Sequence, residues 1–162
     1  MCGIIGISSN KSVSANIINS LKKLEYRGYD SAGVATLFDG EINEVKSEGR
    51  VDNLEQNFDL KSLKGNIGIG HVRWATHGVP NSINAHPHSS YNVSVVHNGI
   101  TENSTILKKH LINKGHIFKS QTDTEVIVHL ITENLKIMEL EEAITKTLKQ
   151  LHGSFALGII FK

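Results

Sequence analysis

The only cysteine of the chain stands at position 2, directly after Met1. A small second residue permits removal of Met1, which would leave the Cys2 thiol beside its own α-amino group. An amine with a pKa of about 7.7–8.0 suits a general base at neutral pH, and an N-terminal nucleophile activated by its own amine is an established arrangement for covalent catalysis. Cys2 is therefore a candidate nucleophile. Its position alone favours the other interpretation, a small hydrophobic residue at the start of a buried strand.

A second chemical candidate is the pair Asn98 and Gly99, which ends an apolar stretch. The side-chain amide of one residue and the backbone N–H of the next can converge on one point, as an oxyanion hole requires. In isolation the pair is more typical of an ordinary Asn-Gly turn that closes a strand, so both interpretations stay open at this stage.

Five of the nine histidines fall between His71 and His97. Their spacing matches no compact zinc motif, and no carboxylate lies between them, so we expect hydrogen-bonding members of a polar pocket and no metal. Lysine supplies most of the positive charge, and the chain has three arginines, Arg27, Arg50 and Arg73. A chain that uses lysine for general positive charge is expected to keep arginine where the planar, forked guanidinium group is needed. Arg27 and Arg73 are the candidates, because they have distinctive neighbours.

Length and composition restrict the kinds of protein to consider. The chain has 162 residues and a formal net charge of +1, which predicts one globular domain and disfavours nucleic-acid binding through bulk charge. No apolar run reaches the roughly 20 residues that cross a bilayer, and the start lacks a secretory signal. A single cysteine excludes an internal disulfide, and no glycine-rich phosphate loop is present. We therefore expect a cytoplasmic protein without a cofactor.

Strands and helices come in separate blocks along the chain, which favours an α+β layered sandwich over repeated βαβ units. Asp39-Gly40 between two apolar stretches predicts a β-hairpin, and the pattern Thr122-Asp123-Thr124-Glu125 predicts a capping box. The expected strands cover 2–7, 32–38, 42–47, 66–74, 92–97 and 155–162; the expected helices cover 13–26, 104–114, 122–135 and 139–152; and 75–91 is a long loop.

Six blocks of sequence, in order, strongly resemble the glutaminase domain of the glutamine–fructose-6-phosphate aminotransferases. These enzymes are class II glutamine amidotransferases of the N-terminal-nucleophile hydrolase superfamily. The blocks are Met1–Ile7, LEYRGYDSAG (Leu24–Gly33), HVRWATHG (His71–Gly78), NAHPH (Asn84–His88), VVHNGITEN (Val95–Asn103) and TDTEVI (Thr122–Ile127).

The resemblance implies a role for each matching residue. Cys2 is the nucleophile that attacks the side-chain amide of L-glutamine, and Asn98 and Gly99 form the oxyanion hole. Arg73 binds the substrate α-carboxylate and Asp123 its α-ammonium group. The remaining implied residues surround the pocket or support it: Trp74, Thr76 and His77 line and close it, His86 lies nearby, and Arg27 is a scaffold residue next to the nucleophile.

The resemblance also implies the fold and the physiological setting. We expect an αββα four-layer sandwich that lacks its last strands, with residues 1–162 forming a single incomplete amidotransferase domain and no sugar isomerase domain. The implied activity is hydrolysis of glutamine to glutamate and ammonia for glucosamine-6-phosphate synthesis. A separate sugar isomerase subunit and a homo-oligomer formed through exposed strand edges are the expected partners. The alternatives are a catalytically silent gene remnant and a glutamine-binding module.

Overall fold

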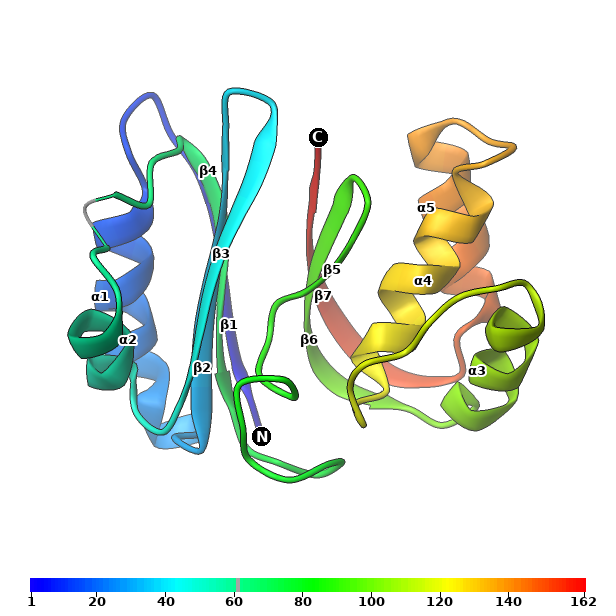
Figure 1. Cartoon of the computed structure of the whole chain (residues 1–162), viewed down its shortest axis with the longest axis horizontal. Coiled ribbons are helices and arrows are strands. Elements are labelled where there is room, and N and C mark those ends of the chain that lie inside the picture. Colours follow the sequence, from blue (N-terminus) through cyan, green and yellow to red (C-terminus); the bar gives the residue numbers. More distant parts are fainter. Residues whose placement is uncertain (61) are drawn as a thin grey trace.

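Two antiparallel sheets stack face to face between two layers of helices in the computed structural model, which describes residues 1–60 and 62–162 (Figure 1). The first sheet has the order β1-β4-β2-β3 and the second the order β5-β6-β7. The strands are β1 (Gly3–Ser8), β2 (Ser31–Phe38), β3 (Glu41–Glu48), β4 (Ile67–Arg73), β5 (His88–Ser90), β6 (Val93–Thr101) and β7 (Gly153–Phe161).

The helices cover the outer faces of the two sheets (Figure 1). On the first sheet lie α1 (Ser14–Leu24) and α2 (Val51–Asn57), and a short 3-10 turn (Glu25–Arg27) follows α1. On the second sheet lie α3 (Ser104–Asn113), α4 (Thr124–Asn134) and α5 (Leu140–Gln150). The arrangement confirms the expected αββα sandwich. No helix in the described residues is long and apolar enough to cross a membrane.

Each helix layer packs on its sheet through a separate apolar core. Ile17 and Leu21 of α1 are fully buried, and they lie against Gly68 and Gly70 of β4, where a Cβ atom would come within 2.5 Å of Ile17. Glycine is therefore needed at these two positions of β4, because side chains of α1 occupy the space where a Cβ atom would lie. Between the sheets the apolar core is smaller, and its buried members are Ala35, Ile69, Val96 and Ile160.

The hairpin prediction is confirmed. β2 and β3 pair in register from Ser31 with Glu48 to Phe38 with Glu41, and Asp39 and Gly40 occupy the turn with φ of 52° and 73°. Two consecutive residues with positive φ are what a type I′ turn requires, and its twist matches that of the strands it joins.

Two local predictions were wrong. β6 continues through Asn98 and Gly99 to Thr101, paired with β7 along its whole length, so the Asn-Gly pair lies inside a strand and not at a turn. The capping box is also absent, because α4 begins at Thr124 and no side chain caps it. Glu125 instead accepts hydrogen bonds from the backbone N–H groups of Lys119 (2.8 Å) and Ser120 (2.6 Å).

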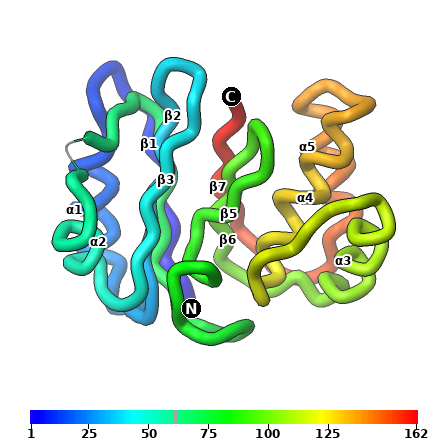
Figure 2. Tube along the Cα trace, viewed as in Figure 1, coloured from blue at the N-terminus to red at the C-terminus, as the bar shows by residue number. Residues whose placement is uncertain are grey.

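The two sheets bring distant segments together at one end of the sandwich. The N-terminus, the loop after β4 and the start of α4 all lie at this end (Figure 2). Residues 75–87 form the loop expected over 75–91, and the rest of that stretch includes β5. The region 49–64, which no sequence pattern resolved, contains α2.

Candidate active site

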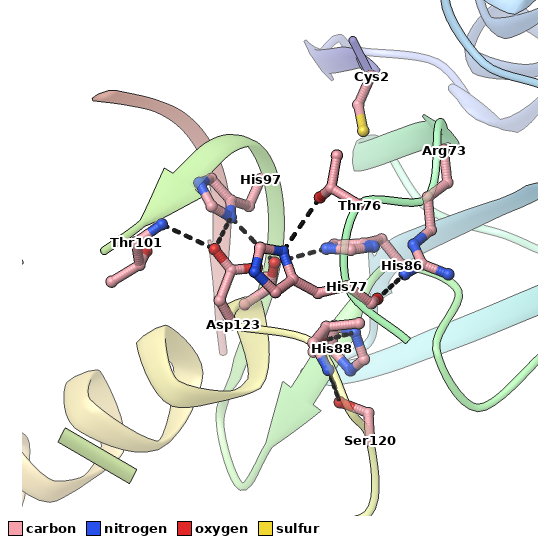
Figure 3. Close-up of polar contacts among 12 residues, drawn as sticks. Cys2, Arg73, Thr76, His77, His86, His88, His97, Thr101, Ser120 and Asp123 are labelled. Atoms are coloured by element: carbon pink, nitrogen blue, oxygen red, sulfur yellow. Dashed lines mark hydrogen bonds and ion pairs between the residues drawn. The ribbon is translucent and has the colours of Figure 1, made fainter. Parts of the chain in front are cut away.

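A small cavity of about 20 Å³ lies at this end of the sandwich and collects most of the predicted site residues. Its lining includes every one of them except Asn98 and Arg27. In Figure 3 the side chains converge on this region from the chain start, the end of β4, the following loop, β6 and the start of α4. The lining residues are Cys2, Arg73, Trp74, Thr76, His77, His86, His97, Gly99, Thr122, Asp123 and Thr124.

Cys2 is held against the backbone of Trp74. Its Sγ lies 3.7 Å from the Trp74 carbonyl oxygen, to which the thiol donates, and 3.5 Å from the Trp74 backbone N–H, which donates to sulfur. Arg27 lies behind the cavity, where its Nε donates to the Cys2 carbonyl oxygen at 2.9 Å. Burial raises the pKa of the Cys2 thiol, so at neutral pH the sulfur needs a base to become a thiolate.

Arg73 places a buried positive charge at the cavity. The residue is 3% exposed, and its guanidinium donates to the backbone carbonyls of His77, Gly78 (3.3 Å) and Val79 (3.4 Å). Within the described residues no carboxylate forms an ion pair with it. The site therefore holds a cation whose partners are neutral carbonyls, and an incoming carboxylate would gain a charge-assisted, forked contact.

Asp123 places a negative charge on the same cavity. Its side chain is 10% exposed, and its Oδ2 accepts a hydrogen bond from the backbone N–H of Thr101 at 2.8 Å. The Nδ1 atom of His97 lies 3.9 Å from the same oxygen. Burial lowers the pKa of His97, while the Asp123 carboxylate opposes that change.

The histidines of residues 71–97 divide into one at the cavity surface, His77, and four that are buried. His71 stacks on His86 with ring centroids 4.1 Å apart, and His88 meets His86 edge-on at 4.7 Å. Burial lowers the pKa of His71 and of His88 to about 3 and that of His86 well below its usual range. These rings are therefore neutral hydrogen-bonding groups, and in the described residues no group of three or more His, Cys, Asp or Glu side chains is arranged to hold a metal ion.

Two glycines permit close packing of backbone around the site. A Cβ on Gly28 would lie 2.4 Å from the backbone carbon of Arg73, and a Cβ on Gly33 would lie 2.0 Å from the carbonyl oxygen of His86. Both glycines belong to the block Leu24–Gly33. Their function is to let the segments that carry Arg73 and His86 approach, which is a different requirement from phosphate binding.

Of the predicted oxyanion-hole pair, only Gly99 borders the cavity, with a φ of 146°. Asn98 is half-buried one position earlier on β6 and does not line it.

The sequence patterns missed Asp30, whose Oδ2 accepts from the backbone N–H of Ala75 and so anchors the start of the loop after Arg73. They also missed Thr124, which binds two histidines. Both residues lie within blocks that carry the family resemblance, but their contacts cross long sequence separations, so the local pattern does not reveal their partners.

Comparison with known proteins agrees with this geometry. The model of the family described as "Glutamine amidotransferase domain" matches residues 71–162. A glutamine–fructose-6-phosphate aminotransferase (isomerizing) of Mesorhizobium japonicum is 53% identical over all of this chain, and one of Pyrococcus horikoshii is 52% identical over 99% of it. The glutamine phosphoribosylpyrophosphate amidotransferase of B. subtilis superposes with a TM-score of 0.88 at 31% identity, covering 99% of this chain and 35% of that one.

The fold and the cavity thus define an amidotransferase of the N-terminal-nucleophile hydrolase class. The chain belongs to the glutamine amidotransferase domain family. It spans 27% of the length of the two curated relatives named above.

Proposed function

We propose that this domain hydrolyses L-glutamine to glutamate and ammonia, with Cys2 as the nucleophile. The observation that carries the proposal is a thiol that shares one cavity with a buried cation, Arg73, and a buried anion, Asp123. Free glutamine carries one carboxylate and one ammonium group, so its recognition calls for such a pair. A site that leaves either charge unpaired would reject analogues that lack the matching group.

The proposed reaction proceeds in two balanced steps. The Cys2 sulfur attacks the side-chain carbonyl carbon, and its proton passes to the α-amino group that removal of Met1 exposes and then to the departing nitrogen. The C–N bond breaks and ammonia leaves, so that a γ-glutamyl thioester remains. Water then attacks the thioester carbon, releasing glutamate and restoring the thiol. The N–H of Gly99 and the side chain of Asn98 are the proposed donors to the oxyanion.

We infer that the loop after β4 moves outward when glutamine binds. The cavity of about 20 Å³ has room for about one water molecule and not for an amino acid. All the carbonyls that Arg73 contacts belong to residues 77–79 of that loop. The outward movement would open space for the substrate and free the guanidinium for the substrate carboxylate. Once glutamine is bound, Trp74, Thr76 and His77 would close over it.

We also propose that the ammonia serves glucosamine-6-phosphate synthesis from fructose 6-phosphate. The curated relatives are named as glutamine–fructose-6-phosphate aminotransferases, and a sugar isomerase domain or subunit is the expected partner. Trp74, which contacts the nucleophile, and Tyr29, which packs edge-on against Trp74, are exposed aromatic residues that offer a surface for that partner. A homo-oligomer formed through strand edges stays a prediction for size-exclusion chromatography. A cytoplasmic location would keep the Cys2 thiol reduced.

The decisive experiment measures glutamate and ammonia release by the purified chain, after intact mass has confirmed loss of Met1. The wild-type protein should turn over glutamine, and Cys2→Ala should abolish turnover. Calorimetry with Cys2→Ala should still detect glutamine binding, since Arg73 and Asp123 remain. Binding by the wild type without turnover would identify a glutamine-binding module instead. A folded, Met1-free protein that neither binds nor hydrolyses glutamine would identify a silent gene product.

A further inference from the structure

One buried hydroxyl, that of Thr124, joins three of the segments that build the cavity. Thr124 is 1% exposed and is the first residue of α4, directly after Asp123. Its Oγ1 lies 2.6 Å from Nε2 of His86, in the loop after β4, and 3.0 Å from Nδ1 of His97, on β6 just before Asn98 and Gly99. Thr124 therefore connects Asp123, its neighbour in the chain, with the loop that carries His86 and with β6, which carries the proposed oxyanion donors.

The two contacts of the Thr124 side chain require a hydroxyl group. A hydroxyl group has one proton, so Thr124 donates to one ring nitrogen and accepts from the other. A proton on His97 Nδ1 is favoured because the Asp123 carboxylate lies 3.9 Å from that atom. Thr124 then accepts from His97 and donates to His86. Both rings are buried, so loss of the hydroxyl would leave two ring nitrogens without a partner.

We propose that Thr124 is a positioning residue, whose hydroxyl sets the spacing between the amino-acid-binding end of the cavity and its oxyanion end. This inference rests on the proposed glutaminase function. Glutamine can span only a limited range of distances between its α-ammonium group and its side-chain carbonyl, so Asp123 and Gly99 must be held at a separation within that range. Thr124 directly follows Asp123 in the chain. Its hydrogen bond to His97 connects it to β6, the strand that carries Gly99.

The test compares Thr124→Val, which keeps the shape but removes the hydroxyl, with Thr124→Ser, which keeps the hydroxyl. The matched control is Thr132→Val, because Thr132 is a buried threonine of the same helix whose hydroxyl donates to the Val128 carbonyl at 2.9 Å, away from the cavity. We expect Thr124→Val to raise KM for glutamine roughly tenfold, with a smaller change in kcat. Thr124→Ser and Thr132→Val should stay within about twofold of the wild type.

Two further measurements separate positioning from folding and from the proposed function. Alkylation of Cys2 by iodoacetamide needs no amino-acid anchor, so its rate should be the same in Thr124→Val and the wild type. A KM in Thr124→Val equal to that of Thr132→Val, with a similar loss of thermal stability, would show a purely structural role and overturn the inference. If the wild type binds glutamine without turnover, only the proposed function fails, and a tenfold weaker affinity of Thr124→Val then supports positioning. If the wild type does not bind glutamine, both proposals fall.

Discussion

In the described residues the Arg73 and Asp123 side chains both contact backbone groups, and the nearest basic side chain to Asp123 is the buried His97 at 3.9 Å. The Arg73 guanidinium donates to carbonyls of residues 77–79, and the Asp123 carboxylate accepts from the N–H of Thr101. Removing a charge from water costs free energy that dipoles offset only in part. The proposed zwitterionic substrate would supply a counter-charge to both groups.

Replacement of Arg73 by lysine should raise KM for glutamine roughly tenfold to a hundredfold, because an ammonium group cannot reproduce the forked contact of a guanidinium with a carboxylate. Steady-state kinetics would measure the change. Arg50→Lys is the matched control, since the Arg50 side chain is 67% exposed and pairs with Glu25 at 3.5 Å, away from the cavity. An unchanged KM in Arg73→Lys would contradict the assignment of Arg73 to the substrate carboxylate.

Asp123→Asn should weaken glutamine binding while the fold persists, because an amide oxygen can still accept from the Thr101 N–H. The sharper readout is discrimination between L-glutamine and its deaminated analogue, which lacks the α-ammonium group. We expect the wild type to prefer glutamine strongly and the variant to lose most of that preference. Asp52→Asn, at an exposed position of α2, should behave as the wild type. A preference that survives in Asp123→Asn would place the ammonium site elsewhere.

At the scale of the elements, the cavity depends on backbone approaching backbone. The 3-10 turn and Gly28 lie directly against the end of β4, so that Arg27 can reach the Cys2 carbonyl and Trp74 can contact the thiol. Gly28 has an extended φ of 178°, so its requirement is space and not unusual backbone geometry. A side chain at this position would displace the segment that carries the site.

Gly28→Ala should therefore lower both stability and activity. Its Cβ would lie 2.4 Å from the Arg73 carbonyl carbon and 2.5 Å from the carbonyl oxygen, and the backbone shift should cost about 1–3 kcal/mol of unfolding free energy. Urea unfolding and glutamine turnover would measure the two effects. Gly6→Ala in β1 is the control, because its added Cβ would lie 3.9 Å from Ile69 Cγ2, an ordinary van der Waals distance. Equal stability of the two variants would refute the close-approach explanation.

At the scale of the whole molecule, neutral histidines occupy part of the space where the two sheets meet. His71 of β4 belongs to one sheet, and its Nε2 lies 2.9 Å from the carbonyl oxygen of His97 in the other. His88 of β5 contacts the Thr122 hydroxyl at 2.9 Å. Burial disfavours the charged form of each imidazole, so the packing of the two halves depends on pH.

The folded protein should lose stability as the pH falls from 7 to 5. Burial lowers the pKa of His71 and of His88 to about 3, whereas the unfolded value is about 6.5. The unfolded state therefore binds more protons between these values. Stability is fully present above pH 6.5 and is lost as the pH falls toward 3, by about 2 kcal/mol per histidine between pH 7 and 5. Urea unfolding at several pH values would measure the slope.

A histidine variant makes this pH test specific. His88→Gln should give a shallower slope between pH 7 and 5, whatever its absolute stability, whereas the exposed His110→Gln should keep the wild-type slope. The Glu125 carboxylate does not interfere in this window. Burial opposes its ionisation, but the nearby His129 ring and hydrogen bonds from Lys119 and Ser120 lower its pKa to about 2, so its contribution is lost only below about pH 4.5. A stability that is flat between pH 7 and 5 would contradict the prediction.

The sequence by itself determined the features that depend on neighbours along the chain or on motifs. The hairpin at Asp39-Gly40 follows from local turn chemistry, and the blocks around Cys2, Arg73 and Asp123 carry the resemblance to the amidotransferases. Only the tertiary structure decided that Gly28 makes room for the backbone of Arg73, that Glu125 binds a preceding loop instead of capping its helix, and that Thr124 joins His86 to His97. The physical reason for Gly28 and Thr124 is that their contacts link residues far apart in the chain, where strand pairing and packing of the two sheets set the distances; for Glu125 it is that the folded path of the preceding loop brings two backbone N–H groups to its carboxylate.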